Sequence, residues 1–336
     1  MTPLLSIEDL RTYFYTEAGV ARAVDGVSLE VGAGETVGLV GESGCGKTVT
    51  ALSILRLIDP PGRIEPDSRI MFDGRDLLRL SPEEIRRVRG NRIAMVFQEP
   101  MTALNPVFTV GDQVAEVARV HDGTSKKDAW KRAVDMLNLV GIPDADVRAR
   151  DYPHQMSGGM RQRVVIAMAL VMKPQLVIAD EPTTALDVTI QAQILDLLRD
   201  LQKKFGMSLL LITHDMGVVA ETASRVVVMY GGEVVEQAPV EQIFARPQHP
   251  YTEGLLAAIP RLGQSRDRLT EIPRTVPPPT QWPSGCRFRE RCAYAWDRCM
   301  TAPPLAPMDS AHAARCHLIS EPQHRQEKHG PLAARA

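Results

Sequence analysis

The sequence predicts an α/β protein with a mixed or mainly parallel sheet, a helical subdomain and a small cysteine-rich C-terminal extension. Three observations indicate this fold. Apolar runs with strand character alternate with segments of helical periodicity, as in a doubly wound parallel sheet. A stretch with helical pattern and no strand signal lies between residues 107 and 155. Four of the five cysteines lie in the last quarter of the chain.

Composition is that of an ordinary globular protein. Hydrophobic residues make up 44% and charged residues 24%, and 39 basic against 41 acidic residues give a net charge of -2. This balance creates no field that attracts nucleic acid, so we expect no nucleic-acid partner. The apolar runs are far shorter than the roughly 18 residues of a spanning helix, and the N-terminus lacks a secretory pattern, so we expect a cytoplasmic chain.

The N-terminal part contains the first expected unit of strand, loop and helix. Residues 4–40 are expected to form strands, of which the last is the apolar run 37–40. Residues 47–57 have helical periodicity, and Pro60-Pro61 stops the helix. The segment between strand and helix, residues 41–48, fits the phosphate-binding P-loop pattern. A glycine-rich turn without function is the alternative interpretation.

A P-loop has the chemistry to hold the phosphates of ATP. Its glycines let backbone N–H groups surround the β-phosphate, and the helix N-terminus adds positive potential. Lys47 is expected to reach the β- and γ-phosphates, and Thr48 to place its hydroxyl on Mg²⁺. Cys45 is interpreted as a small loop residue, not a nucleophile. The expected nucleotide-binding positions in this segment are Gly41, Ser43, Gly44, Cys45, Gly46, Lys47, Thr48 and the following position, Val49.

The middle of the chain is expected to form the helical subdomain, at about residues 100–165. Helical periodicity covers 110–119 and 125–140. Strands and helices then resume, which indicates a return to the sheet. The segments expected there are strands at 176–179, 208–212 and 226–230 and a helix at 190–204.

Two acidic residues, Asp180 and Glu181, follow the apolar strand 176–179. The carboxyl ends of parallel strands share one edge of a sheet, so both carboxylates are expected beside the P-loop. Asp180 would hold Mg²⁺ through water, and Glu181 would polarise the attacking water as general base. Strands that merely end in two solvated acids are common, but the P-loop favours the catalytic interpretation.

The segment 156–162, MSGGMRQ, resembles the signature motif of the ABC ATPase family. The resemblance implies a P-loop NTPase core of RecA-like type. It also implies that Ser157, Gly158 and Gly159 close over the γ-phosphate held by the P-loop of a second ATPase chain. The motif departs from the family at Met156, where leucine is usual, and at Met160, where glutamine is usual. Neither departure removes a phosphate ligand.

Further positions match the same family in the expected order. Gln98 resembles the Q-loop glutamine that senses Mg²⁺ and the membrane partner, and Asp187 resembles the D-loop residue. His214 resembles the switch histidine that contacts the γ-phosphate. The resemblance therefore implies that Glu181, His214 and Lys47 are the catalytic residues of an ATPase.

An aromatic residue near the start of the chain should stack on adenine in this family. Phe14 aligns best, and the neighbouring tyrosines Tyr13 and Tyr15 stay open as alternatives. The family mechanism then has Mg-ATP bound in two sites at a head-to-tail dimer interface and hydrolysed by in-line attack of water.

Three segments narrow the resemblance to the dipeptide and oligopeptide importer ATPases: 98–106, 157–164 and 249–256. That branch implies two integral-membrane permeases, an extracytoplasmic binding protein and a second ATPase, either a copy or a paralogue. The chain would lie on the cytoplasmic face of the membrane. Peptides are the preferred cargo, nickel or another small solute is an alternative, and a non-transport ABC ATPase is a rival. The ATPase domain is expected at 1–250 and the extension at 251–336.

The extension contains Cys286, Cys292, Cys299 and Cys316. In the cytoplasm structural disulfides would be reduced, so a metal site is the preferred interpretation. Four thiolates suit an iron–sulfur cluster or Zn²⁺. Importers with such a tail resemble carriers of a [4Fe–4S] cluster, so we prefer the cluster over zinc, with free thiols as the alternative. Residues 321–336 are expected to be frayed.

Overall fold

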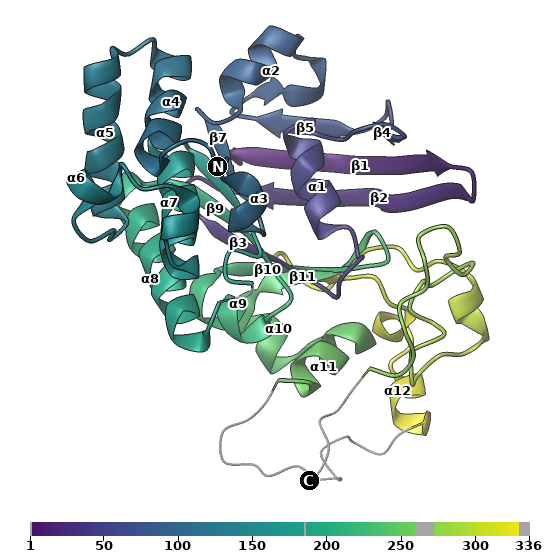
Figure 1. Ribbon diagram of the computed structural model, residues 1–336. Coiled ribbons are helices and arrows are strands. Elements are labelled where there is room, and N and C mark those ends of the chain that lie inside the picture. Colours follow the sequence, from purple (N-terminus) through teal and green to yellow (C-terminus); the bar gives the residue numbers. More distant parts are fainter. Residues whose placement is uncertain (1, 185, 260–271, 329–336) are drawn as a thin grey trace. The chain divides into compact units, whose positions relative to one another are not determined.

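The computed structural model describes residues 2–184, 186–259 and 272–328 (Figure 1). It divides into two compact units that alternate along the chain. The first comprises Val31–Thr36 and Asp73–Ile212, together with the N-terminal residues through Leu4. The second comprises Leu5–Glu30, Val37–Phe72 and the chain from Thr213 onward. Part of the expected frayed tail, residues 329–336, lies outside the described residues.

The first unit combines parallel strands with the expected helical subdomain. Its elements are β6 (Arg75–Asp76), η1 (Leu77–Arg79), α2 (Pro82–Val88), β7 (Ile93–Val96), α3 (Pro100–Ala103), α4 (Val110–Asp122), α5 (Lys126–Leu139), α6 (Ala145–Arg148), η2 (Pro153–Gln155), α7 (Gly158–Leu170), β8 (Leu176–Asp180), α8 (Val188–Phe205) and β9 (Ser208–Thr213). β8 pairs in parallel with β7 on one side and with β9 on the other. Every residue of β8 and β9 is buried, which explains their continuous apolar sequences.

The helices of this unit begin and end at residues with the right local chemistry. Thr109 and Ser125 cap α4 and α5, because each hydroxyl accepts a backbone N–H from the first turn. Gly123 ends α4 in the left-handed conformation that glycine tolerates. α4 and α5 pack against each other and against α7. The helices predicted at 110–119 and 125–140 are therefore confirmed as α4 and α5.

The second unit holds an antiparallel sheet and a further group of strands. Its elements are β1 (Leu5–Thr16), β2 (Gly19–Val31), β3 (Thr36–Val40), α1 (Lys47–Ile54), β4 (Gly62–Ile64), β5 (Arg69–Phe72), α9 (Met216–Thr222), β10 (Arg225–Tyr230), β11 (Glu233–Pro239), α10 (Val240–Ala245), α11 (Pro250–Ala257), η3 (Asp297–Met300), β12 (Ala306–Pro307), β13 (Ala313–Ala314), η4 (His317–Ile319) and α12 (Gln323–Lys328). The antiparallel sheet has the order β2-β1-β5, with β4 on β1. β3 runs parallel to β10, and β10 runs antiparallel to β11.

The C-terminal extension shares a core with the strands of the second unit. Tyr230 of β10, Tyr251 of α11 and Phe288 of the extension belong to one buried cluster. The ring centroids of Tyr230 and Tyr251 are 4.8 Å apart, and those of Tyr230 and Phe288 are 5.1 Å apart. Residues 272–328 are thus packed into the same unit as β3 and the loop that follows it. Among the described residues, no helix has the length and apolar character needed to span a membrane.

Candidate functional site

The P-loop, residues 41–48, joins β3 to α1 and needs glycine at its first residue and directly before α1. Gly41 has φ 153° and Gly46 has φ 105°. A Cβ atom at Gly41 would lie 2.2 Å from the carbonyl oxygen of Met229, and one at Gly46 would lie 2.4 Å from that of Ala23. The loop therefore runs directly against the backbone of β10 and β2, and no side chain fits at either position.

Lys47, the first residue of α1, lies at the centre of the loop. Its side chain is buried, and its Nζ donates to the carbonyl oxygens of Gly41 at 2.7 Å and Glu42 at 3.1 Å. Ser43 and Thr48 are both exposed to solvent. This arrangement has the donors that an anionic ligand requires.

Two other residues of the predicted segment have smaller roles. Cys45 is fully buried, and burial raises the pKa of its thiol, so it stays protonated and unreactive. Val49 has no polar side-chain atom, and its carbonyl oxygen accepts the hydroxyl of Ser53 at 2.7 Å. A contribution of Val49 to phosphate binding is limited to its backbone N–H.

The aromatic residues of β1 point to opposite faces of the strand, as alternation requires. Phe14 lies on the face of Thr12, whose hydroxyl contacts Ser53 of α1 at 2.8 Å. The hydroxyl of Tyr13 donates to Asp25 at 2.5 Å, and that of Tyr15 donates to Glu65 at 2.8 Å.

Burial, followed by the hydrogen bond to Asp25, raises the pKa of Tyr13 to about 12. The Tyr13 hydroxyl therefore stays protonated and bound to that carboxylate. Phe14 lies instead on the face of β1 that contacts α1, the helix that follows the P-loop.

Glu181 is held in a fixed orientation in the first unit. It has φ 44°, a left-handed conformation that is costly for a residue other than glycine. Its Oε2 atom accepts from Gln98 Nε2 at 3.1 Å and from the hydroxyl of Thr184 at 2.8 Å. Asp180, the preceding residue, is 2% exposed at the end of β8. The structure thus brings the predicted Gln98 and Glu181 into direct contact, although 83 positions separate them.

The signature segment forms the start of α7. Ser157 caps this helix and is exposed, and Gly158 is exposed beside it. A Cβ atom at Gly159 would lie 2.9 Å from Ile190 Cγ2, so α8 packs closely against this turn. Asp187 caps α8 by accepting the N–H of Ile190 at 3.0 Å. The exposed N-terminus of α7 presents backbone N–H groups and a hydroxyl to an external anion.

His214 belongs to the second unit and directly follows β9. Its side chain is exposed. The next residue, Asp215, caps α9 by accepting the N–H groups of Gly217 at 2.7 Å and Val218 at 3.3 Å. The histidine is therefore positioned by the rigid start of a helix.

A groove that the sequence did not reveal lies in the first unit between β7, α4 and α7. Its lining is mainly apolar and includes Met95, Phe97, Val117, Val120 and Met168. Phe97 is 40% exposed and Val120 is 66% exposed. Large exposed hydrophobic side chains gathered in a groove indicate a binding surface. Phe97 immediately precedes Gln98, so the groove begins where the predicted Q-loop begins.

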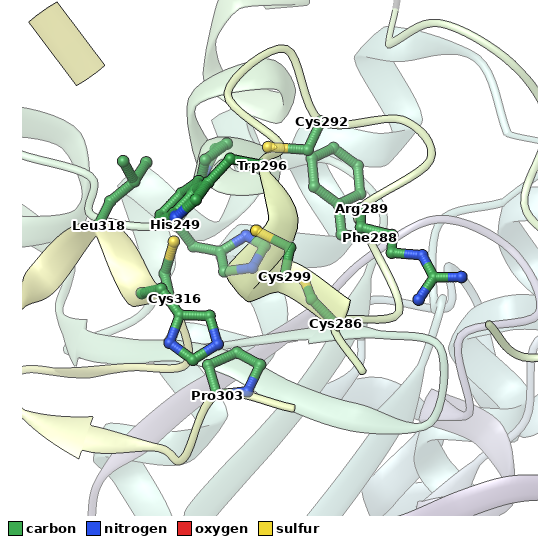
Figure 2. Close-up of a pocket in the computed structure, with 12 residues that line it drawn as sticks. His249, Cys286, Phe288, Arg289, Cys292, Trp296, Cys299, Pro303, Cys316 and Leu318 are labelled. Carbon is green, nitrogen blue, oxygen red and sulfur yellow. The ribbon is translucent and has the colours of Figure 1, made fainter. Parts of the chain in front are cut away.

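The four cysteines of the extension line one small cavity, together with His249 and Trp296 (Figure 2). Burial raises the pKa of Cys286 to about 11 and those of Cys292 and Cys316 to about 12, and neighbouring thiols add to these shifts. Within the described ranges, no three His, Cys, Asp or Glu side chains are arranged to hold a single metal ion.

Two protein families match separate parts of the chain. Residues 24–184 match the family described as ABC transporter. Residues 235–299 match the family described as oligopeptide/dipeptide transporter, C-terminal region.

Relatives match almost the whole length. The oligopeptide transport ATP-binding protein AppD of Bacillus subtilis is 50% identical over 322 residues, covering 96% of this chain and 98% of the relative. The dipeptide transport ATP-binding protein DppD of Escherichia coli is 50% identical over 315 residues, covering 94% and 96%. A dimeric ATP-binding cassette solved in a post-hydrolysis state with ADP and Pi is 27% identical, with a TM-score of 0.63, and covers 70% of this chain and 98% of that one.

Proposed function

Because the chain belongs to the ATP-binding subunits of the ABC transporter family, in the oligopeptide and dipeptide branch, we propose that it hydrolyses ATP to power peptide import. One observation carries the proposal: both the ATPase part and the C-terminal region match that branch, with 50% identity across 96% of the chain. Nickel or another small solute is the alternative cargo.

We propose that the P-loop binds the phosphates through its backbone N–H groups and Lys47. The exposed hydroxyls of Ser43 and Thr48 support this role, because they lie at the open start of α1. Thr48 is the proposed ligand of Mg²⁺ in the second unit, and the ion supplies positive charge at the β- and γ-phosphates when bound. Asp180, in the first unit, is proposed to hold Mg²⁺ through water. Phe14 is proposed as the adenine-stacking residue, since the hydroxyls of both alternatives, Tyr13 and Tyr15, are bound to carboxylates.

Glu181 is the proposed general base for the attacking water. Gln98 and Thr184 both donate to one oxygen of its carboxylate, which fixes the direction of the other. His214, in the second unit, is proposed to contact the γ-phosphate. The proposed reaction is in-line attack of water on the γ-phosphate, giving ADP and phosphate.

A second ATPase chain is proposed to complete each site. Ser157 and Gly158 present an exposed helix N-terminus that closes over the γ-phosphate bound to the partner chain. The dimeric state of the related cassette with ADP and Pi supports this arrangement. Closing and opening of the dimer would drive the transport cycle.

The groove between β7, α4 and α7 is proposed to receive a permease. The exposed side chains of Phe97 and Val120 suit an apolar helix of a membrane partner. Because Gln98 contacts Glu181, a partner seated beside Phe97 would act on the catalytic carboxylate. We propose that the subunit lies peripherally on the cytoplasmic face of the membrane and works with two permeases and an extracytoplasmic binding protein.

For the extension we propose a [4Fe–4S] cluster in preference to zinc. Ligands of one tetrahedral Zn²⁺ ion lie about 3.8 Å apart, given Zn–S bonds of about 2.3 Å. The four thiols surround a shared cavity, but no three are arranged for a single ion in the described part of the chain. Four cysteines around one cavity are the ligand set of a cysteine-ligated cluster, which would require deprotonation of the buried thiols. When bound, the cluster would supply a cross-link between four separate segments.

Iron and acid-labile sulfide analysis of anaerobically purified protein tests the cluster. We expect about four of each per chain and broad absorption near 400 nm, as for a cysteine-ligated cluster. About one zinc per chain, or no metal, would contradict it.

Reconstitution tests the transport function. The chain is combined in liposomes with its proposed permeases and second ATPase, and a peptide-loaded binding protein is added outside. We expect ATP-dependent uptake of labelled peptide, which Glu181→Gln abolishes. ATP hydrolysis without uptake of any peptide, but with uptake of a nickel chelate, would favour the alternative cargo.

A further inference from the structure

The cysteine loop, Cys286–Cys292, contains two buried arginines whose carboxylate partners lie outside the extension. Its sequence is CRFRERC, with Arg287 directly after the first cysteine and Arg291 directly before the second. Their side chains are 9% and 3% exposed. Buried guanidinium groups need ionic and hydrogen-bonding partners, because desolvation is otherwise costly.

Arg291 makes a bidentate ion pair with Glu42 of the P-loop. Nη1 donates to Glu42 Oε2 at 2.6 Å, and Nη2 donates to Oε1 at 2.9 Å. Nε donates to the carbonyl oxygen of Pro273 at 2.9 Å. The guanidinium carbon also lies 5.6 Å from the ring centroid of Tyr230 and 5.9 Å from that of Phe288. The arginine is therefore held on every side and in turn holds Glu42.

Glu42 is an unfavourable residue for a loop that binds an anion. Its carboxylate is 31% exposed, and its carbonyl oxygen accepts from the catalytic Lys47 Nζ at 3.1 Å. An unpaired negative charge here would repel nucleotide phosphates. Arg291 balances that charge, and Tyr251 fixes the same residue by accepting its backbone N–H at 2.7 Å. The extension thus supplies the positive charge that pairs with the Glu42 carboxylate of the P-loop.

Arg287 supports the P-loop from a second direction. It donates to the carboxylate of Asp25 and to the carbonyl oxygen of Gly231. The neighbouring Gly232 donates its N–H to the carbonyl oxygen of Cys45 in the P-loop at 3.0 Å. The two buried arginines of the cysteine loop therefore contact the P-loop or a segment that contacts it.

We propose that the cysteine loop sets the affinity of this subunit for nucleotide, with Arg291 as the positioning residue that neutralises Glu42. The proposal rests on the proposed function, since its ligand is the nucleotide, and adds control of the P-loop by the extension. The proposed route of this effect is the ion pair between Arg291 and Glu42.

Equilibrium binding of MgATP to the full-length chain tests the proposal. Arg291→Gln should raise the Kd about tenfold, because it leaves the Glu42 carboxylate unpaired. The double variant Arg291→Gln/Glu42→Gln should return to within about threefold of wild type, since the repelling charge is gone. A purely structural role for Arg291 would not be rescued in this way. Tripolyphosphate, which lacks adenosine, should follow the same pattern.

Arg325→Gln is the matched control. Arg325 donates to Glu253 at 2.7 Å within the same unit but makes no contact with the P-loop in the described residues. Its removal should leave the Kd unchanged. Arg291→Lys is the second variant, for use if Arg291→Gln does not fold. It retains the charge but loses the bidentate geometry, so its Kd should lie between that of wild type and a tenfold increase.

The outcomes separate this proposal from the function on which it rests. Absence of MgATP binding to the wild type overturns the proposed function. Binding that Lys47→Ala removes, but that Arg291→Gln and Arg291→Lys leave unchanged, overturns only the role of the cysteine loop. Loss of affinity in Arg291→Gln without rescue by Glu42→Gln also overturns it.

Discussion

The P-loop and the cysteine loop are short segments of one unit that differ in where their partners lie along the chain. Lys47 and Gly41, which contact each other inside the P-loop, are six positions apart. Arg291 and Glu42 are 249 positions apart. A local contact set leaves a recognisable spacing in the sequence, whereas a distant pair leaves none.

A sequence motif therefore identifies the residues that contact a ligand. It does not identify the residues elsewhere in the chain that stabilise the motif. Gly41 and Gly46 are required by close backbone contacts, and the spacing of the P-loop pattern predicts them. The charge on Glu42 is balanced from the C-terminal extension, and no pattern within the P-loop announces that.

The largest expected effect tests the motif residues alone. Glu181→Gln should lower the turnover of ATP by about 10²–10⁴ while MgATP still binds, because the general base is lost and the shape is kept. Steady-state phosphate release by the assembled transporter measures this. Glu221→Gln, at an exposed carboxylate on α9, is the control and should retain turnover. Equal rates for wild type and Glu181→Gln would show that the motif had been misinterpreted.

The next effect asks whether distant contacts are as important as the motif. Glu236 of β11 is fully buried and accepts the N–H groups of Gln248 at 2.7 Å and His249 at 2.9 Å and contacts His312 Nε2 at 2.8 Å. Burial by itself raises the pKa of Glu236, but these hydrogen bonds outweigh it and the pKa is lowered. Its contribution to stability is therefore present above pH 4.5 and is lost as the pH falls towards the lowered pKa.

Glu236→Gln should reduce the free energy of unfolding by about 3 kcal/mol near neutral pH, because a buried hydrogen-bonded charge is removed. Its stability should also fall less steeply than that of the wild type below pH 4.5. Urea denaturation at a series of pH values measures both quantities. Glu241→Gln, at an exposed carboxylate on α10, should match the wild type. Parallel curves for Glu236→Gln and wild type would exclude this role.

A third change examines a surface that no motif announces. Val120→Asp should weaken assembly with the permeases about tenfold, since it buries an unpaired carboxylate in the groove. Co-purification with the permeases at graded concentrations measures this. Val147→Asp is matched to it, because Val147 is 65% exposed on α6 and lies outside the groove lining. Equal weakening of assembly in the two variants would contradict the proposal that the groove receives a permease.

The smallest expected effect distinguishes Phe14 from Tyr15 as the residue that stacks on adenine. Phe14→Ala should raise the Kd for MgATP about fivefold, the loss expected for one aromatic stacking contact. Tyr15→Ala should stay within about twofold, because the hydroxyl of Tyr15 is bound to Glu65. Isothermal titration with MgATP compares them. The reverse order would assign adenine stacking to Tyr15.

The sequence predicted the elements whose determinants are local. The strands at 176–179, 208–212 and 226–230 are confirmed as β8, β9 and β10, because buried parallel strands have continuous apolar sequences. The helix predicted at 47–57 ends earlier, at Ile54, since Arg56 adopts a left-handed conformation. Spacing could not reveal that turn.

Pairings between distant segments were beyond the sequence patterns. β13 pairs with β11 through Ala313 and Gln237, and a strand of two residues has no periodicity. Cysteine spacing placed four thiols in one tail but said nothing of Arg291, because its partner belongs to another part of the chain. The groove at Val120 was likewise missed, since exposed apolar residues acquire meaning only when the fold gathers them.

Binding of MgATP to the purified full-length chain is the most direct test of whether this P-loop holds the nucleotide. We expect saturable binding of one nucleotide per chain, lost in Lys47→Ala and weakened about tenfold in Arg291→Gln. Absence of binding, or binding that persists unchanged in Lys47→Ala, would contradict the claim that this P-loop holds the nucleotide.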